Sequence, residues 1–164
     1  MRRFEPSFEK LIRGLDPKSL RVGLSSNREL TVGDFRKLEV WQTSHSLGLA
    51  VYRATARFPS SELYGLTSQM RRAATSISAN LAEGCGRQGD PELRRFIRYS
   101  LGSATELEYH ILLARDLKLL DTSTFAELDR PVHQIQAMLL SLSRALVGKK
   151  GRQGRNPVQS GPAT

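Results

Sequence analysis

Apolar side chains recur at steps of three and four residues between positions 63 and 81, near the middle of the chain. This spacing places them along one face of an α-helix, which turns once in about 3.6 residues. They are Leu63, Leu66, Met70, Ala74, Ile77 and Leu81. The pattern predicts a helix that Ser60 or Ser61 caps and that ends at Gly84, because glycine suits the position after the last helical residue.

A helix is also predicted over residues 34–58, with Asp34 as its N-cap and Pro59 as its stop. It carries two neighbouring apolar seams, which indicate contact with two other helices. Trp41 is expected to anchor the core. The first seam is Val40, Leu47, Val51, Ala54 and Phe58, and the second is Leu38, Trp41, His45, Gly48 and Tyr52.

Two longer helices follow in the second half of the chain. The first is predicted from Asp90-Pro91, an N-cap followed by an N1 proline, to about Leu120. Gly102 and Ser103 in its middle lower helix propensity by about 1 kcal/mol, which is explained if another helix passes close to them.

The last helix is predicted over residues 122–147, capped by Asp121 or Thr122 and ended by Gly148. Its apolar residues stay in phase across Pro131, so we expect a kink rather than two elements. Four helices with short connections and no strand pattern predict an all-α protein, an antiparallel up-down four-helix bundle over residues 34–147.

A polar stripe runs along the predicted helix that ends at Gly84, one position before the apolar face. It consists of Gln69, Arg72, Ser76, Asn80 and Glu83. Since one residue is about 100° of rotation, the stripe borders the apolar face. We hypothesise that Arg72 pairs with Glu106 of the next helix, and that Gln69, Ser76 and Ser103 join this inter-helix network. The alternative is that these residues form a binding site.

The net charge of +9 suggests a polyanionic partner, but most of the excess lies outside the bundle. Residues 34–147 contain fourteen basic and twelve acidic residues. Residues 1–33 are expected to be a flexible extension, either an arm that binds nucleic acid or an unstructured leader. Residues 148–164 are a basic, glycine-rich tail that we expect to be disordered.

Five arginines of the bundle are candidates for binding nucleic acid. They are Arg71, Arg87, Arg94, Arg95 and Arg98. If the bundle brings them to one end, they form a patch suited to phosphates, and a solvated face is the alternative. Phe96 and Tyr99 are the aromatic residues near them, so stacking on single-stranded bases is not strongly indicated. The glycine-rich connector 85–89 lacks the lysine and hydroxyl of a P-loop and is interpreted as a turn.

No catalytic residue, metal ligand or cofactor site is predicted. Helical di-iron sites use Glu-x-x-His, and the residues three positions before His45, His110 and His133 are Gln42, Leu107 and Arg130. The single cysteine, Cys85, excludes an internal disulfide and fits a reducing cytoplasm. No run of 18 apolar residues is present, so no membrane span is expected.

An ordered series of sequence blocks is similar to a known family. The blocks are FRKLEVWQ at 35–42, FP at 58–59, ELYGLTSQ at 62–69, RRAATSI at 71–77, ANLAEG at 79–84 and GSATEL at 102–107. Over about 35–147 the chain resembles the four-helix-bundle proteins encoded in intervening sequences of bacterial 23S rRNA genes, also called S23-type. The resemblance implies a homopentameric ring. It also implies kinship with the accessory variability determinant protein of diversity-generating retroelements, which binds nucleic acid and a reverse transcriptase.

We therefore expect a non-enzymatic, cytoplasmic, oligomeric helical bundle without a cofactor. Its expected role is an accessory factor that binds RNA or DNA through arginine–phosphate contacts. The alternative function is a structural scaffold that binds a protein partner without nucleic acid.

Overall fold

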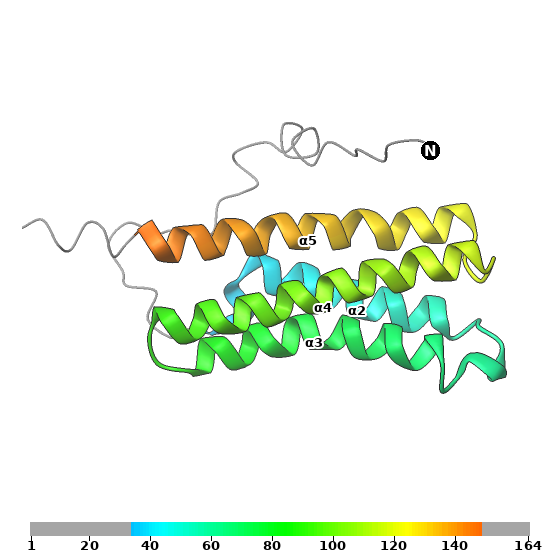
Figure 1. Ribbon diagram of the computed structural model, residues 1–164, viewed down its shortest axis with the longest axis horizontal. Coiled ribbons are helices and arrows are strands. Elements are labelled where there is room, and N and C mark those ends of the chain that lie inside the picture. The colour runs from blue at the N-terminus through cyan, green and yellow to red at the C-terminus, as the bar shows by residue number, and fades with distance from the viewer. Residues whose placement is uncertain (1–33, 149–164) are drawn as a thin grey trace, which may run out of the picture.

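The computed structural model describes residues 34–148, which form a bundle of four long helices (Figure 1). The long helices are α2 (Glu39–Thr55), α3 (Leu66–Gly86), α4 (Asp90–Asp116) and α5 (Thr122–Gly148), and the short 3-10 helices η1 (Phe35–Lys37) and η2 (Ser60–Glu62) precede α2 and α3. No strand occurs in residues 34–148, and the predicted all-α four-helix bundle is confirmed. The expectations for residues 1–33 and 149–164 lie outside the described residues.

Consecutive helices run in opposite directions, as short connections require. The α3–α4 connection and the last turns of α5 therefore lie at one end of the bundle, and the α2–α3 and α4–α5 connections lie at the other (Figure 1). We call the first of these the connector end. α3 packs against both α2 and α4, and α5 also packs against both α2 and α4.

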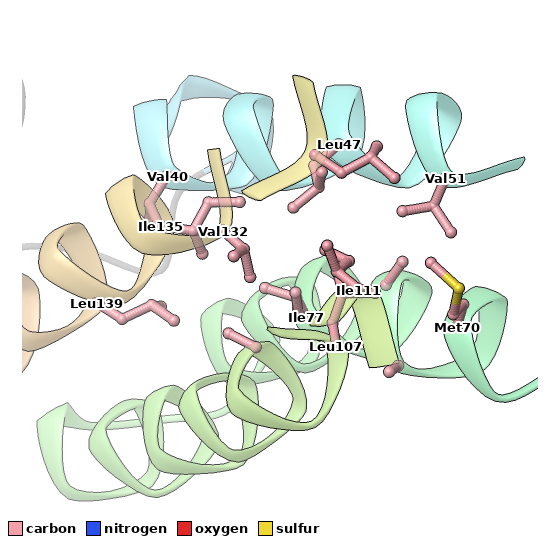
Figure 2. Close-up of a cluster of buried hydrophobic side chains, with 14 of the residues drawn as sticks. Val40, Leu47, Val51, Met70, Ile77, Leu107, Ile111, Val132, Ile135 and Leu139 are labelled. Atoms are coloured by element: carbon pink, nitrogen blue, oxygen red, sulfur yellow. The ribbon is translucent and has the colours of Figure 1, made fainter. Parts of the chain in front are cut away.

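The core is filled by the apolar faces that the sequence pattern predicts. Figure 2 shows Val40, Leu47 and Val51 of α2 facing the apolar side chains of the other three helices. These include Met70, Ile77, Leu107, Ile111, Val132, Ile135 and Leu139, all of which are fully buried. The second seam of α2 is covered less than predicted, because His45 and Tyr52 are exposed and Trp41 is half-buried. Trp41 stacks on His45 with the two rings 5.1 Å apart.

The first two helices begin later than predicted because a short 3-10 turn precedes each of them. Asp34 accepts a hydrogen bond from the Arg36 backbone within η1, and the extended backbone at Leu38 delays α2 to Glu39. Glu62 Oε2 accepts from the backbone N–H of Leu66, so a carboxylate and not Ser60 or Ser61 satisfies the start of α3. Leu63 consequently lies outside α3 and is 48% exposed.

The glycines have structural roles that differ from those predicted from the sequence. Gly84 lies buried inside α3, which continues to Gly86, and the positive φ of 88° falls on Gly89 just before α4. A Cβ at Gly84 would lie 2.7 Å from Phe96 Cβ, whereas one at Gly102 would meet nothing within 4 Å. The expectation that a helix passes close to Gly102 is therefore wrong for the described chain, and the close approach of α3 and α4 is at Gly84.

The connection between α4 and α5 is longer than predicted. α4 ends at Asp116 instead of Leu120, and Lys118 adopts a φ of 59° in the turn. Asp121 then caps α5 by accepting from the Thr124 backbone and the Ser123 hydroxyl, both at 2.7 Å. α5 continues through Pro131 as one helix, and its apolar residues keep their phase on both sides of the proline.

Candidate nucleic-acid interface

The ring of Phe96, near the start of α4, is the centre of a group of basic and aromatic side chains. The Arg95 guanidinium carbon lies 5.4 Å from its centroid, and the Arg87 guanidinium carbon lies 5.9 Å from it. The ring of Tyr99 meets it edge-on, with the centroids 5.7 Å apart. Phe96 is 5% exposed, and Tyr99 is 50% exposed. We call Arg87, Arg95, Phe96 and Tyr99 the Phe96 cluster.

The local backbone explains why residues from two helices reach one ring. The bare Cα of Gly84 lets Phe96 pack directly on α3, since a side chain at this position would collide with it. Arg87 leaves α3 in extended conformation, and Gly89 reverses the chain into α4 with a φ that other residues rarely adopt. Arg87 and Arg95 therefore approach Phe96 from different elements at the connector end.

Two carboxylates accompany these arginines. Arg87 Nη2 lies 2.6 Å from Glu83 Oε1, and Arg95 Nη2 lies 3.1 Å from Glu92 Oε2. The hydrogen bond from Arg87 to Glu83 raises the pKa of this guanidinium further above its usual range. All four side chains are between 40% and 55% exposed, so both ion pairs are solvated and can exchange their partners.

Arg94 and Arg98 lie on α4 beside the Phe96 cluster and make no ion pair within residues 34–148. Arg98 is exposed, whereas Arg94 is half-buried and its Nε atom is buried without a hydrogen-bond partner. A buried donor without a partner is unfavourable, but this atom is not accessible to an incoming phosphate. The structure thus places four of the five candidate arginines near the connector end.

Arg71 lies elsewhere. Its Nε atom donates to Thr55 Oγ1 at 2.8 Å, and its guanidinium carbon lies 4.8 Å from the centroid of Tyr52. Both partners belong to the last turns of α2, at the end of the bundle opposite the connector end. The fifteen helical steps from Arg71 to Gly86 correspond to about 22 Å. The structure therefore does not bring Arg71 into the patch with the other arginines.

The polar stripe of α3 forms an ion pair with α4, as hypothesised. Arg72 Nη2 donates to Glu106 Oε1, and Gln69 Oε1 accepts from Arg72 Nη2 at 3.0 Å. The Arg72 side chain is 58% exposed, so the pair lies on the surface and not in the interior. Ser76, Asn80 and Ser103 are half-buried, and within residues 34–148 they make no hydrogen bond to this network.

Two polar contacts between helices were not anticipated from the sequence. Ser100 Oγ donates to the Ile77 carbonyl at 3.0 Å in the buried α3–α4 seam. Gln136 Nε2 donates to Glu108 Oε2 at 2.7 Å between α4 and α5. The spacing of Ser100 from Phe96 and Ala104 gives a signal for the first contact, because it places the serine on the buried face of α4.

The described residues give no support to metal chemistry or to a reactive thiol. Residues 34–148 contain no group of three or more His, Cys, Asp or Glu side chains placed to hold a metal ion. Burial raises the pKa of the Cys85 thiol, which lowers the fraction of nucleophilic thiolate. None of the helices in this part of the chain has the length and apolarity needed to cross a bilayer.

Comparisons with known proteins agree with this architecture. The model of a family described as 23S rRNA-intervening sequence protein matches residues 36–141. A crystal structure described as a protein with unknown function from the S23 ribosomal protein family of Bacteroides thetaiotaomicron VPI-5482 superposes with a TM-score of 0.58. It is 19% identical, and the match covers 64% of this chain and 98% of that one, which shows a shared fold. Comparison with curated proteins finds no match.

Proposed function

Because the chain belongs to the 23S rRNA-intervening sequence protein family, we propose that it binds RNA or DNA through arginine–phosphate contacts, as a non-enzymatic accessory factor. One observation carries this proposal: Arg87 and Arg95 converge on the ring of Phe96 at the connector end, and Arg94 and Arg98 belong to the same early turns of α4. A guanidinium presents donors in a planar fork that matches phosphate oxygens.

The arginines at the connector end can exchange their glutamate partners for phosphates when nucleic acid binds. Glu83 and Glu92 hold Arg87 and Arg95 in the free protein. A phosphate can replace such an exposed carboxylate, because surface ion pairs are worth only about 0–1 kcal/mol. The exposed side chain of Arg98 adds donors that make no ion pair within residues 34–148.

We also propose that the protein acts as a homo-oligomer, and the resemblance to the S23-type family favours a pentamer. Residues 34–147 have a net charge of only +2, so a single bundle offers few phosphate contacts. Several copies on one strand multiply these contacts through avidity. Multi-angle light scattering tests the assembly, and a monomeric mass would contradict this part of the proposal. A reverse transcriptase or another nucleic-acid-processing protein is the partner that the resemblance suggests.

A salt titration tests the binding. A fluorescein-labelled RNA is titrated with the protein by anisotropy, at ionic strengths from low to moderate. Contacts to several phosphates predict a steep linear fall of log K with log salt. A variant that carries both Arg87→Gln and Arg95→Gln is expected to bind more weakly with a shallower slope. Unchanged affinity of this variant would place the contacts elsewhere. A second variant tests the tail in the same assay and carries Lys149→Gln, Lys150→Gln, Arg152→Gln and Arg155→Gln.

A scaffold that binds a protein partner is the second candidate. Large apolar side chains are exposed at the end of the bundle opposite the connector end, namely Leu63, Tyr64 and Leu117. Tyr64 is 91% exposed, which suits an anchor for a partner surface. This function predicts a protein complex that Tyr64→Ala weakens, together with no salt-dependent affinity for RNA.

A further inference from the structure

We propose that Tyr99 is a stacking platform for an unpaired base, so that the connector end recognises single-stranded nucleic acid in preference to a duplex. This inference rests on the proposed function, because the flanking arginines must first hold the strand. It assigns the base-contacting residue and the structural class of ligand.

The setting of Tyr99 differs from that of an ordinary exposed tyrosine. Half of the residue is solvent-accessible, yet its ring is held edge-on by the buried ring of Phe96 at an interplanar angle of 90°. Phe96 is itself packed against Gly84 of α3. The ring is therefore positioned before a ligand arrives, and less side-chain entropy is lost when a base stacks on it.

The surroundings of Tyr99 suit a base with its phosphates. Arg95 precedes Tyr99 by one helical turn, and Arg98 is its neighbour in the chain. One turn further along the helix, Gly102 leaves open space, because a Cβ there would meet nothing within 4 Å. Basic residues that can hold the backbone thus precede Tyr99 on α4, and open space follows it at Gly102.

The other tyrosines of the chain lack this combination. Tyr52 lies under the guanidinium of Arg71, and Tyr109 packs against His110 on the stretch of α4 next to Glu106. Tyr64 is more exposed than Tyr99, but it lies at the end of the bundle opposite the connector end. Tyr99 is the tyrosine that shares its aromatic neighbour with two arginines.

Stacking implies selectivity for unpaired nucleotides. In a duplex the faces of the bases are covered by their neighbours, and a protein reads mainly the backbone and the groove edges. Arginine–phosphate contacts alone would serve a duplex and a single strand alike. An aromatic platform adds affinity only where a base is free, by about five-fold to a hundred-fold per stacked base.

The test measures the affinity of the full-length protein for three labelled probes. These are a short single-stranded RNA without self-complementarity, the duplex formed with its complement, and a single DNA strand of abasic residues. We expect Tyr99→Ala to weaken single-strand binding by about five-fold or more and to leave duplex and abasic binding unchanged. Tyr99→Phe retains a ring and is expected to bind like the wild type. Tyr64→Ala is the matched control, and thermal unfolding verifies that each variant folds.

Two results would overturn the platform while leaving the proposed function in place. One is equal affinity of wild type and Tyr99→Ala for the single strand while the Arg87→Gln and Arg95→Gln variant loses affinity. The other is equal loss on the single strand and the duplex, which would indicate an effect on the backbone contacts. If the wild-type protein binds none of the three probes, the proposed function itself is overturned.

Discussion

Gly84 of α3 lies directly against Phe96 of α4, at a distance that leaves no room for any larger residue at position 84. A Cβ built on Gly84 would stand 2.7 Å from Phe96 Cβ and 3.1 Å from Leu93 Cδ1. Carbon atoms in contact are normally about 3.5–4.0 Å apart. This contact sets the spacing of α3 and α4 at the connector end, and it positions the ring on which Arg87, Arg95 and Tyr99 converge.

Replacing Gly84 by alanine should therefore destabilise the bundle, although alanine favours helix formation. We expect Gly84→Ala to lower the free energy of unfolding by about 1–3 kcal/mol, because the helices must separate to admit the methyl group. Urea denaturation measures the effect. Gly102→Ala is the matched control in α4: nothing lies within 4 Å of the added Cβ, so stability should rise by up to about 1 kcal/mol. Equal effects at both positions would contradict the close packing at Gly84.

The hydrogen bond between Ser100 and the Ile77 carbonyl gives a second prediction for the same seam. Ser100 is completely buried, whereas Ser103, one turn away on α4, is half-buried and has no such bond within the described chain. Both serine-to-alanine changes gain the same helix propensity, so the difference between them isolates the hydrogen bond. Ser100→Ala should be less stable than Ser103→Ala by about 0.5–1.5 kcal/mol in urea denaturation. Ser100→Ala as stable as Ser103→Ala would show that this bond adds nothing.

The helices and the core follow from local rules that the sequence displays. Apolar spacing placed Met70, Ile77 and Leu81 on the buried face of α3, and all three are fully buried. The spacing also stayed in phase across Pro131, and α5 is one helix. Burial of a regular stripe is the dominant contribution to a bundle, so these features are readable without knowledge of the neighbours.

The site is less predictable because it depends on distances between helices. Gly84 reads as a helix terminator, but its role comes from Phe96, which is twelve residues away in the chain. The sequence predicts Arg71 and Arg87 as members of one arginine patch, but they lie near opposite ends of α3. Periodicity assigns a residue to a face, and it does not give the position of that residue relative to another helix.

The Arg72–Glu106 pair is expected to contribute little to stability. Both side chains are partly solvated, at 58% and 35% exposure. A double-mutant cycle with Arg72→Met and Glu106→Gln should give a coupling energy of about 0–1 kcal/mol, because exposed pairs gain little over water. The coupling should also fall as salt is added. A coupling of several kcal/mol, insensitive to salt, would contradict a surface pair.

Asp121 should make the stability of α5 depend on pH in the acid range. Hydrogen bonds from the Thr124 backbone and the Ser123 hydroxyl lower the pKa of this carboxyl to about 2. A group with a lowered folded pKa stabilises the protein above its unfolded pKa of about 3.9, and this stabilisation is lost as pH falls through the folded value. The Tm difference between wild type and Asp121→Ala should therefore be full at neutral pH and shrink between about pH 4 and pH 2. A difference that stays constant over this interval would contradict the carboxylate cap.

Arg71 separates a structural arginine from the proposed ligand-binding ones. It donates to the buried hydroxyl of Thr55 and covers the ring of Tyr52. Arg71→Ala should therefore lower the free energy of unfolding by about 1 kcal/mol and leave the salt slope of RNA binding unchanged. Arg95→Ala should have the opposite profile, with nearly unchanged stability and a slope smaller by about one. Arg57→Ala, an exposed arginine at the same end as Arg71, controls for the loss of charge. If Arg71→Ala reduces the slope as much as Arg95→Ala does, the ligand extends along the length of α3 and the connector end is not the whole interface.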